Sequence, residues 1–309
     1  MSMPSQRVRA DLAMGLCTLI WGATFVVVKD ALPDMSIIAY LAVRFSLAAA
    51  LMGMVFWRSL RQMNGRTAWA GVQIGLCMFG GYIFQTTGLA YTTPAKAAFI
   101  TGICVVLVPL FLAVFGARRI TGWIWMGAAA ALLGLYFLTV PAEGFGGLNR
   151  GDPIAFGCAV MFAFHIIFIS RHVGEHSVGS LAFLQVATTA ALSLIAVPIA
   201  AAAGWERPRI IWNERVIAAV LVTSILSTVL GFSLQTWAQR HTSPSHTAIL
   251  VSLEPVFAAI TSWLLARERF GARTLAGAAL ILAGILLAEL KGPAPVVPES
   301  PEPIAPGAE

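Results

Sequence analysis

Charged side chains are scarce in this sequence: aspartate, glutamate, lysine and arginine together make up 11% of its 309 residues. A typical soluble domain carries about 25%. Hydrophobic residues reach 58% and the mean hydropathy is +0.82, which is more apolar surface than a water-soluble fold can bury. The composition therefore argues against a soluble enzyme. The net charge of +6 comes from short basic clusters between apolar runs, as in membrane proteins, so we expect no nucleic-acid partner.

Cysteine motifs and the common catalytic motifs are also missing. The four cysteines lie in apolar segments without C-x-x-C spacing and predict small buried thiols: Cys17, Cys77, Cys104 and Cys158. The sequence contains no G-x-S-x-G motif, P-loop or dinucleotide fingerprint, so we expect no cofactor. Residues 172–176 fit the H-x-x-E-H pattern of some zinc proteases, but Gly174 falls within it, where the chain should turn. No third ligand is evident, and we expect no metal site.

Long apolar runs dominate the chain instead. A helix needs about 20 apolar residues to span a bilayer. Ten segments qualify: 10–31, 36–57, 69–91, 94–115, 121–140, 152–172, 179–203, 214–240, 244–265 and 271–290. We expect an all-α integral membrane protein, because backbone polar groups in lipid must be satisfied within each segment. We expect residues 1–9 to be a cytoplasmic N-terminus before an uncleaved first helix, and the proline-rich residues 291–309 to be a disordered cytoplasmic tail.

The sequence repeats itself at an offset of 150 residues. The matching pairs are Gln85 with Gln235, Thr92 with Thr242, Pro94 with Pro244, Ala98 with Ala248 and Gly134 with Gly284. The first and sixth segments align less well, at an offset of 142. We therefore predict two five-helix repeats, residues 10–140 and 152–290, joined by a linker at 141–151. Because five is odd, the second repeat enters the membrane from the opposite face, as in many secondary transporters.

Prolines depart from this repeat at one point. Pro109 matches Pro255 only at an offset of 146, so the proline of helix four lies about one turn later than that of helix nine. Each proline frees a carbonyl and bends its helix. We therefore expect kinks at different depths in the two helices.

Three motifs carry a resemblance to a known family. They are WGATF at 21–25 in helix one, YTTPAKAAF at 91–99 leading into helix four, and EPVF at 254–257 before RER at 267–269 in helix nine. With the duplication and the ten-helix count, the chain resembles the EamA-like branch of the drug/metabolite transporter superfamily over about residues 10–290. The resemblance implies export of small metabolites or drugs through a cavity between the halves. It also implies that helices one, three, four, six, eight and nine line this cavity. In helix six, AFH at 163–165 replaces the Trp-Gly step.

Ionisable groups near the bilayer centre are costly and are functional candidates by default. Glu254, eleventh in helix nine and directly before Pro255, is the clearest. It either binds substrate or a proton, or holds a kinked helix together. His165, deep in helix six, is the other candidate for proton coupling, or else a neutral hydrogen-bonded core residue. Arg44, in helix two, either snorkels or pairs with a helix end, or binds an anion.

The remaining candidates for the translocation path are polar or aromatic: Trp21, Phe25, Tyr82, Gln85, Lys96, Phe99, Gln235 and His246. The two glutamines are repeat-related and lie on helix faces that either line a wet cavity or form packing seams. Trp21 and Phe25 are one turn apart and either form an aromatic wall or pack in the core. Lys96 and His246 occupy matching positions at the starts of helices four and nine, where they face the path or lie at the interface.

The sequence favours a secondary transporter that exports amino-acid-like metabolites or drugs across the inner membrane by alternating access. Without a Walker motif, a gradient supplies the energy or transport is downhill, so proton coupling and uniport both stay open. The expected partners are a small-molecule substrate, the lipid bilayer and, with coupling, protons; no obligate protein partner is evident. The alternatives are a non-transporting receptor or assembly module and an intramembrane enzyme, for which no catalytic set can be assembled.

The basic residues predict that both termini lie in the cytoplasm. In the first repeat, seven lie on the N-terminal side (Arg7, Arg9, Arg58, Arg61, Arg66, Arg118 and Arg119) and three on the other (Lys29, Lys96 and Arg150). Early helices usually dominate insertion. A green fluorescent protein fused after Lys291 should therefore fluoresce, and alkaline phosphatase at the same site should be inactive. Phosphatase activity there would establish the opposite orientation.

Overall fold

Helices make up nearly all of the structure. The computed structural model describes residues 6–91, 99–115, 120–140, 143–144, 150–257, 260–261 and 271–291, and residues 292–309, the expected tail, lie outside them. Among the described residues there is no strand, only an isolated antiparallel bridge between Met35 and Ile210. Six helices in this part are long and apolar enough to cross a membrane: Ile37–Val55, Gly65–Gly88, Gly122–Thr139, Gly151–His172, Val178–Ala202 and Glu214–Ala238. The prediction of an all-α integral membrane protein is confirmed.

The helices follow the ten predicted segments. Their bounds are α1 (Gln6–Ala31), α2 (Ile37–Val55), α4 (Gly65–Tyr91), α6 (Cys104–Val114), α7 (Gly122–Thr139), α8 (Gly151–His172), α9 (Val178–Ala202), α10 (Glu214–Val222), η2 (Thr223–Leu230), α11 (Gly231–Ala238), α12 (Pro244–Val251) and α14 (Ala272–Lys291). Two short elements, η1 (Leu32–Asp34) and α3 (Trp57–Leu60), lie in connections. Predicted helix eight is the continuous run of α10, η2 and α11, in which η2 is a π-helix.

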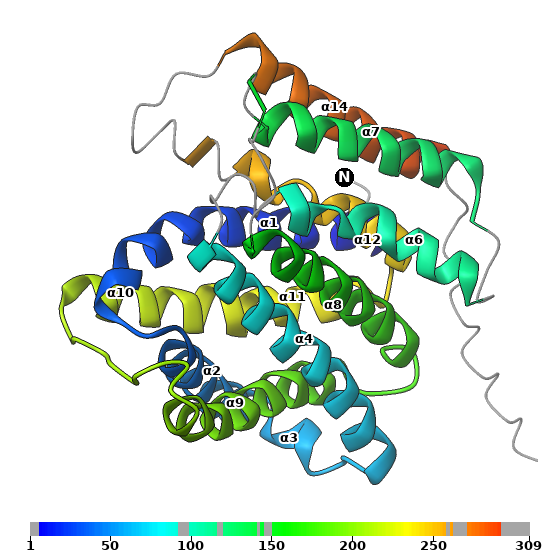
Figure 1. Ribbon diagram of the computed structural model, residues 1–309. Coiled ribbons are helices and arrows are strands. Elements are labelled where there is room, and N and C mark those ends of the chain that lie inside the picture. Colours follow the sequence, from blue (N-terminus) through cyan, green and yellow to red (C-terminus); the bar gives the residue numbers. More distant parts are fainter. Residues whose placement is uncertain are drawn as a thin grey trace, which may run out of the picture.

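Two pairs of helices form the outer layers of the molecule. In Figure 1, α7 lies along α14 at one edge, and α2 lies beside α9 at the opposite edge. The other six predicted helices lie between these pairs. Their contacts respect the repeat: α1 packs on α11 as α8 packs on α4, and α1 packs on α12 as α8 packs on α6. Exchanging the two repeats therefore reproduces the packing, as an inverted duplication requires.

Glycines between α7 and α14 show the same symmetry in atomic detail. A Cβ atom on Gly127 would lie 2.7 Å from the carbonyl oxygen of Gly284, and one on Gly134 would lie 2.6 Å from that of Gly277. An offset of 150 converts Gly127 into Gly277 and Gly134 into Gly284, so each contact is the repeat-related copy of the other. Such reciprocity is expected across a two-fold axis. Small residues here let the two backbones approach closely in lipid.

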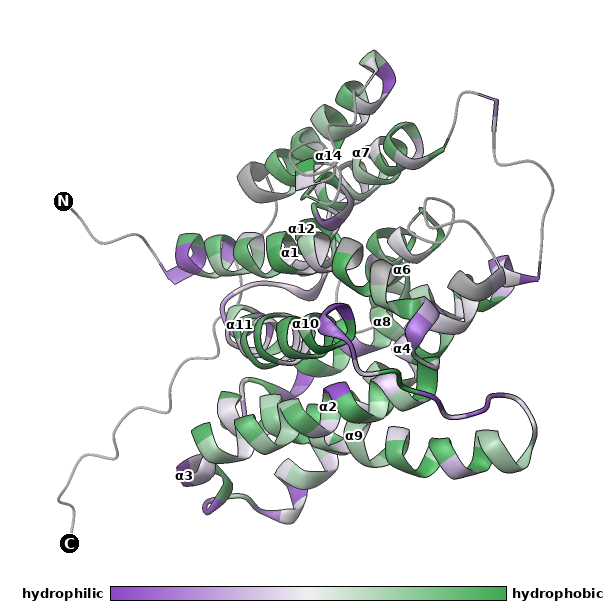
Figure 2. Cartoon of the chain, turned by 90° about the vertical axis from the view of Figure 1, so that its left-hand side faces the viewer, coloured by the Kyte–Doolittle hydropathy of each residue, from purple (hydrophilic) through white to green (hydrophobic). Residues whose placement is uncertain are grey.

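Apolar side chains cover the outside of the helices as well as the core. Figure 2 shows hydrophobic residues along most helices and hydrophilic ones mainly at helix ends and in loops. Five leucines, each more than half exposed, lie on α1, α7, α9 and α14: Leu12, Leu133, Leu194, Leu275 and Leu286. An apolar exterior of this extent is what lipid-facing helices require. The four cysteines are buried and free, as predicted.

The two repeats are bonded together at one end of the bundle, where α1 turns into α2 and α9 is followed by α10. The Glu206 carboxylate accepts hydrogen bonds from the backbone N–H groups of Ile37 and, at 2.9 Å, Ile38. These groups open α2, and a helix N-terminus favours an acid. In the same loops the Asn213 side chain donates to the Asp34 carboxylate at 2.7 Å. We call these contacts the loop clasp.

The glycine contact predicts a destabilising substitution. In Gly277→Ala the new Cβ would lie 2.6 Å from the backbone nitrogen of Leu138 and 2.7 Å from the Gly134 oxygen, so α7 and α14 must separate. We expect a loss of about 1–3 kcal/mol, typical of overpacking, read as a lower melting temperature in detergent. Gly15→Ala in α1 is the control, because no atom lies within 4 Å of its Cβ. Equal melting temperatures for the two variants would contradict the close contact.

Candidate functional site

Helices four and nine are interrupted at matching places in the two repeats. In helix four, Phe99–Gly102 is helical, the chain turns at Ile103 and α6 begins at Cys104. In helix nine, α12 ends at Val251, the chain turns at 252–253 and helix resumes at Glu254. Ile103 and Leu253 are 150 residues apart, and each backbone N–H bonds three residues back, at 3.2 and 3.0 Å.

This arrangement differs from the kinks expected from proline. The two prolines predicted distortions at different depths, whereas the observed interruptions are repeat-related. Pro109 lies inside α6, several residues beyond the interruption at Ile103. Pro255 follows Glu254 in the first turn of the resumed helix, where proline costs little because that N–H has no helical partner. The repeat, not the proline position, therefore sets where each helix breaks.

Glu254 opens the second part of helix nine. Its repeat counterpart is Cys104, which opens the second part of helix four and is buried. Glu254 is half-buried, and within the described residues it has no hydrogen-bond or ion-pair partner. The residues that flank it, Leu253 and Val256, belong to one apolar cluster with Met14 of α1, Val105 of α6 and Leu135 of α7. Glu254 therefore lies on a segment that packs against helices of the first repeat.

Aromatic rings gather where α1, α4, α8 and α11 meet. Tyr82 makes edge-on contacts with Phe162 of α8 and Phe232 of α11, at centroid distances of 5.6 and 6.3 Å. Trp21 packs on Phe232 at 5.2 Å, and its indole N–H donates to the carbonyl oxygen of Ser227 at 2.9 Å. We call Trp21, Tyr82, Phe162 and Phe232 the central aromatic cluster. Sequence analysis identified Trp21 and Tyr82 but missed both phenylalanines, which nothing distinguishes from other apolar helix residues.

His165 adjoins this cluster but belongs to a closed hydrogen-bond chain. It is 1% exposed, and its Nε2 lies 2.8 Å from Oε1 of Gln185 in α9. The Gln185 amide donates to the Thr236 hydroxyl at 2.9 Å, and that hydroxyl donates to the Phe232 carbonyl at 2.6 Å. The chain links α8, α9 and α11. Gln185 is a further residue that sequence analysis missed, although a glutamine within an apolar run was a visible signal.

The repeat-related glutamines differ in their surroundings. Gln235 is 2% exposed, and its Oε1 has no hydrogen-bond partner in the structure. Gln85 is half-buried. On helix eight, Ser224 donates to the backbone oxygen of Arg44 at 3.0 Å, and the Gly231 oxygen accepts from the Cys17 thiol at 3.3 Å. This face of helix eight is therefore a packing seam against α1 and α2.

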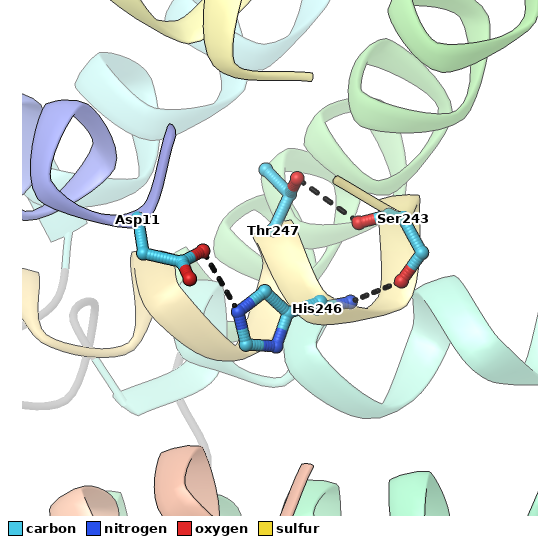
Figure 3. A network of polar contacts seen from close by, with 4 residues as sticks. All are labelled: Asp11, Ser243, His246 and Thr247. Carbon is cyan, nitrogen blue, oxygen red and sulfur yellow. Dashed lines mark hydrogen bonds and ion pairs between the residues drawn. The ribbon is translucent and has the colours of Figure 1, made fainter. Parts of the chain in front are cut away.

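The other sequence candidates lie apart from the centre or beyond what can be described. Phe99 packs on Tyr136 of α7, with centroids 6.1 Å apart. His246 begins α12, where its Nε2 lies 3.1 Å from the Asp11 carboxylate of α1 and its backbone N–H donates to the Ser243 hydroxyl (Figure 3). Lys96, the residue that matches His246 in the first repeat, lies outside the described residues, as does the side chain of Phe25.

The histidines of the H-x-x-E-H pattern hydrogen-bond to α4. The helix α8 ends at His172, so the pattern does not lie on one continuous helix. The His172 ring bonds to Gln73 at 2.9 Å, and the His176 ring bonds to Thr67 at 3.1 Å. Within the described residues, no group of three histidine, cysteine or acidic side chains is placed to hold a metal ion.

Arg44 lies deep in the bundle, near the middle of α2, away from either helix end. Its side chain is 5% exposed. The guanidinium donates from Nε to Thr228 Oγ1 at 3.0 Å, and from Nη2 to Ser227 Oγ at 3.1 Å and the Tyr82 hydroxyl at 3.2 Å. It also lies over the Tyr82 ring, 4.9 Å from the centroid. Arg44 therefore connects α2 to the π-helix and to the central aromatic cluster.

Comparison with known proteins gives one family and one fold. The EamA-like transporter family matches residues 8–140 and again 149–290. An uncharacterized transporter of Archaeoglobus fulgidus is 35% identical over 291 residues, covering 93% of this chain and 87% of the relative. The threonine/homoserine exporter RhtA of Escherichia coli (strain K12) is 29% identical over 185 residues, 60% of this chain and 58% of the exporter. A crystal structure 20% identical in sequence aligns with a TM-score of 0.77 over 92% of this chain and 97% of that chain.

Proposed function

This chain belongs to the EamA-like transporter family, and we propose that it exports an amino-acid-like metabolite or a drug across the inner membrane by alternating access. Membership makes it a multi-pass membrane transporter of small molecules. In the proposed orientation both termini are cytoplasmic. The relative RhtA is a threonine/homoserine exporter, which favours amino acids as the first compounds to test.

The interruptions of helices four and nine are the observation that carries this proposal. Transporters built from inverted repeats bind substrate between the repeats, at helices that are broken near the midplane. Here the two interruptions are repeat-related, and Glu254 lies at one of them. The central aromatic cluster draws its rings from α1, α4, α8 and α11, and so from both repeats. Aromatic rings and a carboxyl group on these central helices suit a small molecule that carries an amino group.

Proton coupling is assigned to Glu254 and not to His165. The Nε2–H of His165 donates to Gln185 Oε1, and the ring is 1% exposed, so a second proton would enter at Nδ1 as a buried charge with no acidic partner among the described residues. Glu254 is half-buried and has no hydrogen-bond partner in the described structure. It can therefore exchange a proton or accept a substrate ammonium without first breaking an internal bond.

Contacts at the two ends of α1 are candidates for the gates that alternating access requires. The loop clasp follows the end of α1 and joins the repeats through Glu206 and Asn213. The pair of Asp11 and His246 lies near the start of α1 and joins it to α12 (Figure 3). Opening toward one side of the membrane would separate the contacts at that end while the other end stays bonded.

Removal of the Glu254 carboxylate tests the coupling. Glu254→Gln keeps the size and hydrogen-bonding capacity of the side chain but cannot titrate. In proteoliposomes supplied with single amino acids from outside, we expect uptake driven by a pH gradient to fall about tenfold or more. Expression and melting temperature should stay close to those of the unmodified protein, and Glu254→Asp should keep part of the activity.

The matched control is Glu214→Gln, which removes an exposed carboxylate at the start of α10. It should transport normally. A Glu254→Gln protein with the original rate and the original pH dependence would make Glu254 structural. Failure of that variant to accumulate in the membrane would also support the structural role.

A further inference from the structure

The guanidinium of Arg44 has no acidic partner. An arginine in a protein is always protonated, and this one is 5% exposed in the middle of α2. Its hydrogen-bond acceptors are three hydroxyl groups, those of Tyr82, Ser227 and Thr228, and none of the described carboxylates lies within ion-pair distance. Hydroxyl oxygens and aromatic rings share the charge, but they do not neutralise it. The positive charge is therefore uncompensated inside the bundle.

The acceptors come from an irregular part of helix eight. Ser227 and Thr228 belong to η2, the π-helical stretch Thr223–Leu230. At its end, the backbone N–H of Gly231 donates to the oxygen of Leu226, five residues earlier. The repeat-related residues of helix three, 73–80, are regular α-helix within α4. A π-helical insertion often marks a functional site, because it costs regular bonding and re-aims the side chains around it. Here it directs two hydroxyls at Arg44.

Holding α2 against helix eight does not require a charge. One turn before Arg44, the hydroxyl of Tyr40 donates to Thr223 at 2.9 Å, which ties the same two helices with neutral groups only. A desolvated ion is costlier to bury than a neutral hydrogen-bonded pair unless an opposite charge compensates it. The charge of Arg44 therefore calls for an anion that is present during part of the working cycle.

The position of Arg44 indicates that this anion binds at the central aromatic cluster. Its partner Tyr82 is half-buried and belongs to the central aromatic cluster. The cluster thus has a positive group on its α2 side, and Glu254 of helix nine is the carboxyl group that the proposed function gives to the same substrate. A molecule with a carboxylate at one end and an ammonium at the other is complementary to both.

We propose that Arg44 is the anchor for the carboxylate of the substrate, which replaces the Tyr82 hydroxyl on Nη2 and accepts a hydrogen bond from it. A guanidinium presents its N–H groups in a planar fork that suits a carboxylate. The Ser227 and Thr228 hydroxyls stay in place and hold the fork. The inference rests on the proposed transport function and names its substrate class: small zwitterions, with the ammonium toward Glu254.

Paired ligands test this class. The purified protein is tested by thermal shift against the twenty L-amino acids and their carboxamides, which lose the carboxylate but keep the ammonium and side chain. A ligand that binds only the folded state raises the melting temperature. We expect at least one amino acid to stabilise the protein. Its carboxamide should bind about 30-fold more weakly, or more weakly still, because a desolvated charge pair then loses one partner. Equal affinities for all acid–amide pairs, or no stabilisation by any acid, would overturn the proposal.

Variants then test whether the preference for the acid over the amide depends on Arg44. Arg44→Gln should bind acid and amide with equal, weak affinity, and Arg44→Lys should keep a reduced preference for the acid. Ser224→Ala is the matched control: it removes a neutral tie between the same helices, to the backbone oxygen of Arg44 and not to its guanidinium, and should keep the full preference. An unchanged preference in Arg44→Gln would refute the anchor. If that variant does not fold, Arg44→Lys decides, and an unchanged preference there has the same consequence.

Transport is measured separately, by proteoliposome uptake of the acids that bind. Acid-selective binding that depends on Arg44, without uptake of any bound acid, would support the anion site and contradict the proposed export. Uptake with the same rates for acids and amides in both the unmodified protein and Arg44→Gln would support export and contradict the anion site. The two proposals therefore fail by different results.

Discussion

Polar groups inside a bilayer must find their partners within the chain, and the rest of this structure depends on that constraint. Helices satisfy the backbone, and hydroxyl side chains return to the carbonyl of the preceding turn, as Thr189 does to Gln185 and Thr236 to Phe232. Longer polar side chains bond across helices instead, as His165 does to Gln185. Buried polar groups therefore also specify which helices are neighbours. Apolar contacts alone specify this less strongly, because lipid tails are as apolar as the helix surfaces.

Against this background, several buried polar groups lack a partner, and three groups bear on the proposed site. They are the carboxyl of Glu254 and the amide oxygen of Gln235, neither of which has a hydrogen-bond partner in the described structure, and the uncompensated charge of Arg44. In the proposed mechanism, a ligand or a proton compensates such groups during part of the working cycle. Incomplete satisfaction is therefore one of the reasons for proposing that substrate binds there.

Much of the fold followed from the sequence because periodicity and duplication are strong signals. Ten apolar segments, the inverted repeat and the burial of the cysteines needed only segment length and an offset of 150. The interruptions at Ile103 and Leu253 did not follow, since neither position carries a glycine or proline. Nor did two of the three hydroxyl partners of Arg44, Ser227 and Thr228, which lie about 180 residues away on η2. A π-helix has no sequence signature comparable to the periodic apolar residues of an amphipathic helix. The direction in which its hydroxyl groups point is therefore known only from the structure.

The departures from symmetry matter more to transport than the symmetry itself. Duplication gives two five-helix repeats, and in each repeat one central helix is interrupted at the same position. The second repeat then differs at two points, with Glu254 where the first has Cys104 and a π-helix where the first has regular α-helix. The bonds from Arg44 to Ser227 and Thr228 cross from one repeat to the other, so motion of the repeats must keep or replace them. A carboxylate at the guanidinium would keep them, because it replaces only the Tyr82 hydroxyl and compensates the charge that the hydroxyls share. Occupation of the proposed site would then hold α2 of the first repeat to helix eight of the second, which links substrate binding to the conformational change.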